Sequence, residues 1–285
     1  MKTKAIKDLS QLSDKDLFEE IADGLALVIE NATRIEGDSI FLAEHDHSRG
    51  CEILRSVAEE EAAKFLILLD AVRCDRSANN DDFSRQLGYF NEHLAKLIYA
   101  ESSSFRLANF REIRELIESM REEYYLDGPE GVEWIFPNRI IHEREKKMYV
   151  DYIESDGKHN WTSPKPFKCF EKGNTIFCKM PTDVLELVNA LNEVGCTKPD
   201  ALKVIAFKWR PVKMSDDFPT YKLRELNRET LEDLEKNGLL HEQPQEVYAT
   251  IVNRWFFPLC SLNLRVEKVD QSSLRNIQKQ WAPDF

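Results

Sequence analysis

Two segments of the chain place side chains suited to acid–base chemistry beside an apolar helical pattern. Residues 58–64 read Ala-Glu-Glu-Glu-Ala-Ala-Lys, and residues 90–96 read Phe-Asn-Glu-His-Leu-Ala-Lys. Charged groups at the edge of a core are costly unless they are paired. Histidine is the side chain best suited to move a proton near neutral pH. The two segments therefore predict either a structural polar network or a functional site.

Helical geometry separates the three glutamates of the first segment. The apolar face of this helix is marked by Leu54, Phe65 and Val72. At about 100° per residue, Glu61 falls near the middle of that face and Lys64 towards its edge. Glu60 lies further round, and Glu59 lies on the solvent side. We therefore expect Glu61 to be the buried carboxylate that needs a cation or several hydrogen-bond donors.

The second segment puts further polar side chains along one flank of its helix. These side chains are Arg85, Tyr89, Glu92, His93 and Lys96. His93 lies nearest the edge of the core, where it can bind a buried carboxylate or act as a general acid or base. A network that fixes helix register and a catalytic site explain this arrangement about equally well.

The elements that hold these segments are predicted to be helices. Residues 1–127 show four amphipathic patterns, at about 13–35, 48–73, 83–98 and 110–124. Ser13, three residues before Asp16, has the spacing of a helix N-cap. Four such helices with short connections predict an antiparallel bundle.

The pattern changes at Asp127–Gly131, which we take as a boundary between regions 1–127 and 128–285. Residues 147–153 are rich in β-formers, and a turn signal at 155–158 precedes an extended stretch at 161–164. This predicts a short β-hairpin. Helices are expected from Asp183 to Gly195 and near 199–208, 220–238 and 243–255, with a last strand at 262–266. The fold class is therefore mainly α, a helical bundle followed by an α+β region.

The charge of the chain limits how it meets other molecules. Its net charge is −12, and residues 1–127 hold 16 Lys/Arg against 27 Asp/Glu. Such an acidic half does not attract nucleic acid at long range, so RNA chemistry there needs a local basic site. A basic segment at 203–213 brackets Phe207 and Trp209, although a solvated face explains it more simply. Since no stretch is long and apolar enough to cross a bilayer, we expect a cytoplasmic protein that does not contact membranes.

Cysteine and histidine spacing gives no sign of a metal or cofactor. The six cysteines form no Cys-x-x-Cys motif, which fits a reducing compartment. Cys169 and Cys178 are near enough in sequence to face each other across a hairpin. Glu44-x-x-His47 has the spacing of di-iron bundles, but those need the motif on two helices. The common hydrolase and nucleotide-binding motifs are also absent from the sequence.

Several short motifs occur in an order that resembles the AbiV-type abortive infection proteins of the HEPN superfamily. Arg49-Gly50 precedes the Glu60-Glu61-x-x-Lys64 pattern, and Phe90-x-x-His93-x-x-Lys96 follows it. Asn31-Ala32 matches the family's Asn-Ala, whereas Ala63 stands where the family usually has glycine. The resemblance covers about residues 15–125.

The resemblance implies a dimeric helical bundle used against phage, and in many HEPN proteins a metal-independent ribonuclease. The residues that it assigns are His93 as general acid or base, Arg85 or Arg49 on the phosphate, Glu61, Lys64 and Lys96 around them, and Tyr89 with Arg49 for RNA binding. HEPN sites have four to six residues between arginine and histidine. Arg85 and His93 have seven between them, which is roughly 12 Å of rise on one straight helix. This spacing is long for two groups that bind one phosphate, unless the helix breaks at Gly88 or a second subunit supplies the arginine.

Two functions of different classes remain open on this basis. In the first, a homodimer cleaves an RNA substrate at the site of His93. In the second, the charged cluster is structural, and the protein blocks a phage or host factor such as part of the translation machinery. A phage-encoded activator or target is a partner in either case. The acidic charge of the bundle favours the function in which the protein blocks a phage or host factor, and the family resemblance favours RNA cleavage.

Overall fold

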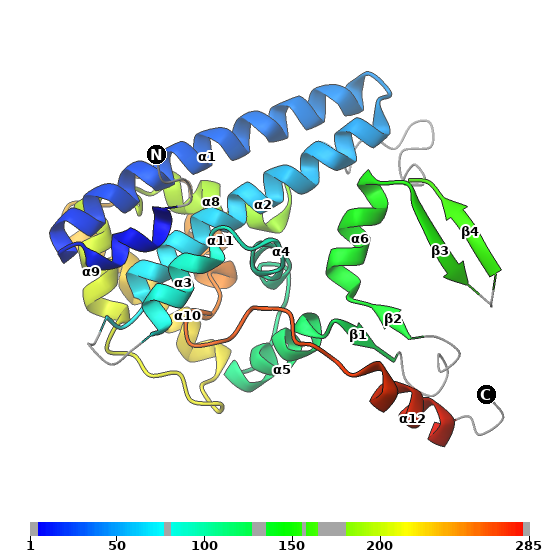
Figure 1. Cartoon of the computed structure of the whole chain (residues 1–285). Coiled ribbons are helices and arrows are strands. Elements are labelled where there is room, and N and C mark those ends of the chain that lie inside the picture. The colour runs from blue at the N-terminus through cyan, green and yellow to red at the C-terminus, as the bar shows by residue number, and fades with distance from the viewer. Residues whose placement is uncertain (1–4, 77–80, 127–134, 156–157, 165–180, 282–285) are drawn as a thin grey trace.

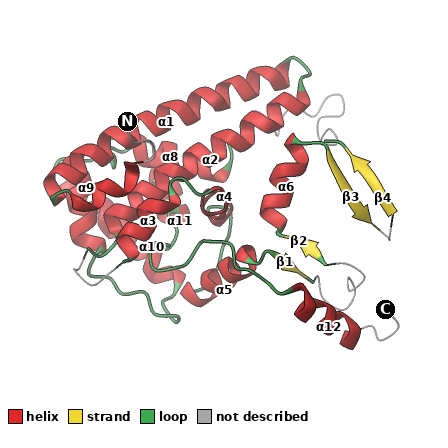
Figure 2. Cartoon of the chain, in the orientation of Figure 1, coloured by secondary structure: helices red, strands yellow, loops and turns green. Residues whose placement is uncertain are grey.

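A computed structural model describes residues 5–76, 81–126, 135–155, 158–164 and 181–281 (Figure 1). The described chain is mainly helical, as predicted, and its strands form two small antiparallel pairs (Figure 2). The elements, in chain order, are η1 (Ala5–Gln11), α1 (Asp14–Glu44), α2 (Ser48–Arg73), α3 (Asp82–Tyr89), α4 (His93–Ser102), α5 (Phe110–Arg121), β1 (Tyr124–Tyr125), β2 (Phe136–Pro137), α6 (Arg139–Met148), β3 (Asp151–Ser155), β4 (Lys158–Thr162), α8 (Asp183–Glu193), α9 (Pro199–Trp209), α10 (Thr220–Lys236), α11 (Gln245–Arg254) and α12 (Gln271–Trp281).

Helices α1 and α2 form a long antiparallel hairpin, and we call this hairpin the frame because other helices pack against it (Figure 1). The side chain of Ser13 caps α1 by accepting a hydrogen bond from the backbone N–H of Asp16, at 3.3 Å. This confirms the predicted cap, which satisfies one of the free N–H groups of the first turn. The bounds predicted for α2 are also confirmed.

The third predicted helix is in fact two helices, α3 and α4. The N–H groups of Phe90, Asn91 and Glu92 each bond a carbonyl three residues back, so the last turn of α3 tightens and the helix ends. Glu92 is extended, and α4 begins at His93. The prediction of one helix over residues 83–98 was therefore wrong, and the chain breaks just after Gly88, close to the position that the sequence offered as an alternative.

The second half of the chain packs against this frame. The predicted hairpin is confirmed as β3 and β4, with Tyr152 opposite Trp161. Helices α8 to α11 are also confirmed, and α8 is followed by Gly195, whose φ of +92° suits glycine. The strand expected at 262–266 was wrong, since this segment is irregular. Helices α6 and α12 were not anticipated.

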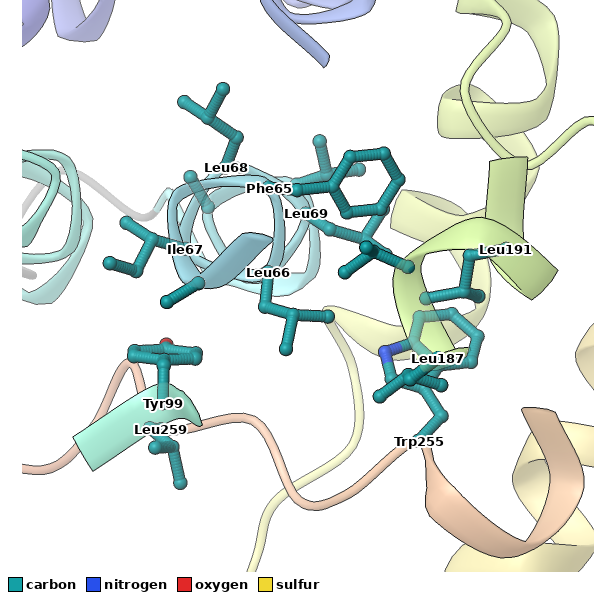
Figure 3. Close-up of a cluster of buried hydrophobic side chains, with 14 of the residues drawn as sticks. Phe65, Leu66, Ile67, Leu68, Leu69, Tyr99, Leu187, Leu191, Trp255 and Leu259 are labelled. Carbon is teal, nitrogen blue, oxygen red and sulfur yellow. The ribbon is translucent and has the colours of Figure 1, made fainter. Parts of the chain in front are cut away.

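Helix α2 lies at the centre of the core, with other elements around it. Figure 3 shows the side chains of residues 65–69 pointing outwards from α2 in several directions, and every residue from 65 to 73 is buried. Leu187 and Leu191 of α8, Tyr99 of α4 and Leu259 surround them (Figure 3). One cluster of buried apolar side chains extends from Leu17 to Leu264.

The two predicted regions thus share one core, and their division at residue 127 stays a prediction about the chain. The boundary segment 127–131 lies outside the described residues, as do Cys169 and Cys178. Among the described residues, Cys51, Cys74, Cys196 and Cys260 are free thiols. No helix in the described part of the chain is long and apolar enough to cross a membrane.

Candidate functional site

The buried carboxylate of the acidic triplet is Glu60. Its side chain is only 6 % exposed, whereas Glu61 is half-buried and forms an ion pair with Lys64. The expectation that Glu61 is the buried member was wrong. The stripe of Leu54, Phe65 and Val72 marks only one of the buried faces of α2, and Glu60 lies on another face, towards α4 and α6.

Three helices converge on the Glu60 carboxylate. Oε2 accepts a hydrogen bond from Lys96 Nζ at 2.6 Å and lies 2.8 Å from His93 Nδ1. Oε1 accepts a hydrogen bond from Arg144 Nε of α6, at 2.5 Å. His93 and Lys96 are three positions apart in the first turn of α4, so they lie on the same face of that helix. We call Glu60, His93, Lys96 and Arg144 the Glu60 cluster.

The environment of Glu60 keeps its carboxyl group ionised. Burial by itself raises the pKa, but the hydrogen bonds from Lys96 and Arg144 outweigh burial and hold the pKa at about 2. With Lys96 and Arg144 each contributing one positive charge, the cluster carries a net charge of about +1 when His93 is neutral. Glu59, the neighbour of Glu60 on α2, offsets part of this positive charge, since the two carboxyl groups interact electrostatically.

The ionised Glu60 also determines which nitrogen of His93 carries the hydrogen. A carboxylate only accepts hydrogen bonds, so we infer that Nδ1 of neutral His93 is the N–H that points to Glu60. Lys96 Nζ is also 3.3 Å from Nδ1, but an Nδ1 that carries the hydrogen has no lone pair with which to accept a bond from the ammonium. Nε2 is then the nitrogen with the lone pair. The His93 side chain is 60 % exposed, and no hydrogen bond within the described structure reaches Nε2.

Arg85 and Tyr89 lie against the irregular C-terminal segment. Arg85 forms an ion pair with Asp82 and donates a hydrogen bond to the carbonyl of Cys260, at 3.0 Å. Tyr89 is fully buried, and its hydroxyl bonds the backbone of Leu262 and Leu264. These contacts hold the segment on the bundle. A buried ring has no face open to RNA, so the position of Tyr89 does not favour its predicted role.

Arg49 is exposed at the start of α2 and reaches the end of α6, where its Nη2 donates a hydrogen bond to the carbonyl of Met148, at 3.3 Å. Lys64, besides its pair with Glu61, has its Nζ 5.3 Å from the centre of the Phe90 ring. Neither residue bonds Glu60 directly in the described contacts. Both remain predicted parts of a larger site.

Arg144 is the member of the cluster that sequence reasoning missed. The available signal was the N-cap of Asn138, whose side chain accepts a hydrogen bond from the N–H of Ile141 and which begins α6. That signal predicts a helix, but it does not predict a contact with Glu60, which lies 84 residues earlier.

Other candidate sites are weaker. In the basic segment at 203–213, Lys208 pairs with Glu229 and Asp233, Arg210 pairs with Asp14, and Trp209 is buried. These pairings favour the simpler interpretation that the segment is not a binding site. Within the described residues, no group of three or more His, Cys, Asp or Glu side chains is placed to hold a metal ion.

Comparison with known proteins gives one match. A family model described as AbiV, of the HEPN type, matches residues 20–168, which is more than half of the chain. No curated protein and no solved structure matches. The matched range contains all four residues of the Glu60 cluster, and it continues past the predicted boundary at residue 127.

Proposed function

Since this chain belongs to the AbiV family of HEPN domains, whose role is abortive infection in defence against phage, we propose that it acts by cleaving RNA at the Glu60 cluster without a metal ion. One observation carries this proposal. The Glu60 carboxylate lies within hydrogen-bond distance of Nδ1 of His93, and the exposed His93 side chain has its other ring nitrogen, Nε2, open to a ligand. An oriented histidine with one open nitrogen is the arrangement that general acid–base catalysis needs.

In the proposed reaction, Nε2 of His93 takes the proton of a ribose 2′-hydroxyl. The 2′-oxygen then forms a bond to the adjacent phosphorus, and the bond from phosphorus to the 5′-oxygen breaks. The leaving 5′-oxygen takes a proton from the imidazolium or from water. The products are a 2′,3′-cyclic phosphate and a 5′-hydroxyl. Glu60 stabilises the imidazolium and keeps its orientation.

Negative charge on the phosphate needs a cation close to His93. Arg144 is the best-placed arginine within one chain, because it binds the same carboxylate as His93. Its guanidinium presents further N–H groups, which suit phosphate oxygens. The assignment of Arg85 to the phosphate stays a prediction. We expect Arg144→Ala to reduce cleavage far more than Arg85→Ala does, and equal losses would contradict this assignment.

The test compares wild type with His93→Ala in a phage-plaque assay and measures the integrity of total RNA in the same cells. His142→Ala is the matched control, because His142 is an exposed histidine on α6 outside the cluster. Circular dichroism checks that both variants fold. We expect His93→Ala alone to lose both protection and RNA fragments. Protection that survives His93→Ala excludes the proposed chemistry.

One observation favours the second function, in which the protein blocks a phage or host factor. Residues 1–127 hold 27 acidic against 16 basic side chains, and this charge disfavours a polyanionic substrate. A wild-type protein that protects cells while their RNA stays intact would support this binding function. The Glu60 cluster would then be a structural network.

We further propose that the protein works as a homodimer in the cytoplasm. The family resemblance is what supports a dimer, and Leu27 and Phe41, two large apolar side chains that α1 exposes, are the positions at which we test for its interface. Light scattering after size exclusion measures the oligomeric state directly. We expect Leu27→Glu with Phe41→Glu to give a monomer, and an unchanged mass would exclude this face as the interface.

A further inference from the structure

The β3–β4 hairpin exposes aromatic rings that the proposed reaction does not use. Trp161 is 74 % exposed and Tyr152 is 52 % exposed. The hairpin lies beside the C-terminal end of α6 and projects from the bundle (Figure 1). Large exposed aromatic side chains that are grouped together mark binding surfaces in proteins that otherwise bury them.

The rings form a short ladder along one face of the hairpin. Tyr152 and Trp161 are directly opposite each other, and their ring centres are 4.9 Å apart. His159 is two residues from Trp161 on the same strand, so it lies on the same face. Its ring is 5.7 Å from that of Tyr152, with 28° between the planes. We call Tyr152, His159 and Trp161 the aromatic ladder.

Helix α6 connects the ladder to the Glu60 cluster. Arg144 of α6 binds Glu60, and β3 begins at Asp151, just beyond the end of α6 at Met148. Arg49 crosses from α2 to this junction by its bond to the carbonyl of Met148. Lys147 lies in the last turn of the helix. Arg49, Lys147 and Arg144 therefore all lie on or against α6, the helix that joins the hairpin to the Glu60 cluster.

Charge complementarity points to the ligand. Helix α6 holds four basic and two acidic side chains, in a chain whose net charge is −12. Strands β3 and β4 themselves hold Asp151 and Glu154 against Lys158, so the attraction for an anionic strand comes from α6 and not from the hairpin. Unpaired bases stack on aromatic rings whatever their sequence, whereas the bases of a duplex already stack on one another.

We propose that the aromatic ladder is a base-stacking subsite for single-stranded RNA, whose backbone passes Arg49 and Lys147 to reach His93. This inference rests on the proposed function, because it describes how the substrate of that same site is held. It makes Trp161 and Tyr152 binding residues that contribute to affinity and to the preference for single strands. They take no part in the chemical step.

The test uses the full chain with His93→Ala, so that RNA binds without being cut. Fluorescence anisotropy measures the Kd for a short labelled single-stranded RNA of mixed sequence and for a duplex of the same length. We expect Trp161→Ala and Tyr152→Ala each to weaken single-strand binding by about tenfold, and the duplex to bind weakly in every case. Phe207→Ala is the matched control, since it removes an exposed aromatic ring on α9.

The outcomes separate this inference from the proposed function. If Trp161→Ala leaves the Kd unchanged while wild type cleaves RNA through His93, the aromatic ladder does not bind RNA, and the proposed cleavage is retained. If RNA binding depends on Trp161 but wild type cleaves no RNA, the RNA-binding role of the aromatic ladder is retained and the proposed cleavage is rejected. Loss of phage protection in Trp161→Ala with an unchanged Kd also overturns the ladder, and it indicates a protein partner at the hairpin.

Discussion

Helix α2 supplies two buried carboxylates, Glu60 and Asp70, and the surroundings of the two differ in one decisive respect. Each binds an arginine and a side chain of α4. At Asp70 both partners of the ion pair are 1 % exposed, whereas at Glu60 the histidine partner is 60 % exposed. The same kinds of side chain thus form a sealed network in one region and an open one in the other.

The sealed network has a complete set of internal partners. Asp70 pairs with Arg73 and accepts hydrogen bonds from the Tyr99 hydroxyl at 2.6 Å and from the backbone N–H of Leu259 at 2.8 Å. The Arg73 guanidinium lies 4.7 Å and 4.8 Å from the ring centres of Trp209 and Trp255. Burial, together with the nearby charge of Asp70, raises the pKa of Tyr99 well above its ordinary value.

A network whose members are all buried can only stabilise the fold, whereas a network with an exposed member can also meet a ligand. Asp70 joins α2 to α4 and to the segment after α11, and no member of the network meets solvent. Glu60 joins α2 to α4 and α6 in the same way, but it presents His93 at the surface. Stability measurements can therefore test the distinction without any knowledge of the substrate.

The largest effect is expected from Asp70→Ala. This change leaves Arg73 as a buried charge without its carboxylate, and we expect it to reduce the free energy of unfolding by about 3–5 kcal/mol. Urea unfolding followed by circular dichroism measures the loss. The double variant Asp70→Leu with Arg73→Met removes both charges and is expected to be more stable than Asp70→Ala. A loss below about 1 kcal/mol would contradict a sealed brace.

The next effect is that of Glu60→Gln, and it depends on pH. The pKa of Glu60 in the folded protein, about 2, is below its ordinary value of 4.5. Ionised Glu60 therefore stabilises the fold fully above pH 4.5, and this contribution is lost as the pH falls towards 2. At neutral pH the contribution is up to about 3 kcal/mol.

The measurement for Glu60→Gln is the difference in unfolding free energy between wild type and variant from pH 2 to pH 7. We expect the difference to be largest at neutral pH and to shrink between pH 4.5 and pH 2. Glu115→Gln is the control, since Glu115 is an exposed glutamate on α5. If the difference in unfolding free energy is constant over this range, the cationic partners of Glu60 do not lower its pKa in the folded protein.

A smaller effect is expected from Tyr99→Phe in the sealed network. The hydroxyl donates to Asp70 and accepts a hydrogen bond from Gln86 Nε2, at 2.8 Å, while Asp70 keeps Arg73 and the N–H of Leu259. The expected loss is about 1–2 kcal/mol, measured by urea unfolding. The exposed Tyr221→Phe serves as the control. A loss as large as that of Asp70→Ala would show that Tyr99 holds the network alone.

The smallest effect on stability is expected from His93→Ala, at most about 1 kcal/mol. Glu60 keeps Lys96 and Arg144 in this variant, and the histidine is largely in solvent. Unfolding and RNA cleavage are measured on the same preparation, and we expect cleavage to disappear while stability barely changes. If His93→Ala destabilises the protein as much as Asp70→Ala, the Glu60 cluster is a second brace.

Much of the local structure was predictable because its signals lie within a few residues. The cap at Ser13, both ends of α2, the glycine after α8 and the β3–β4 hairpin all follow from short patterns of side chains. The family resemblance also follows from short motifs, and the matched range of 20–168 includes them. The division of one apparent helix into α3 and α4 was harder, since its apolar pattern continues across the break.

The sequence alone thus determined the helical class, the bounds of α2, the approximate bounds of α8 to α11 and the two charged segments, because backbone hydrogen bonding and capping depend on near neighbours. It did not place the end of α1, which was expected near residue 35 and lies at Glu44. Only the tertiary structure decided which carboxylate is buried and what it binds. Glu60 meets partners 33, 36 and 84 residues away, and a helical wheel has no information on such distances. Because α2 is packed on several sides, a single apolar stripe pointed to Glu61, whereas packing against α4 and α6 selected Glu60.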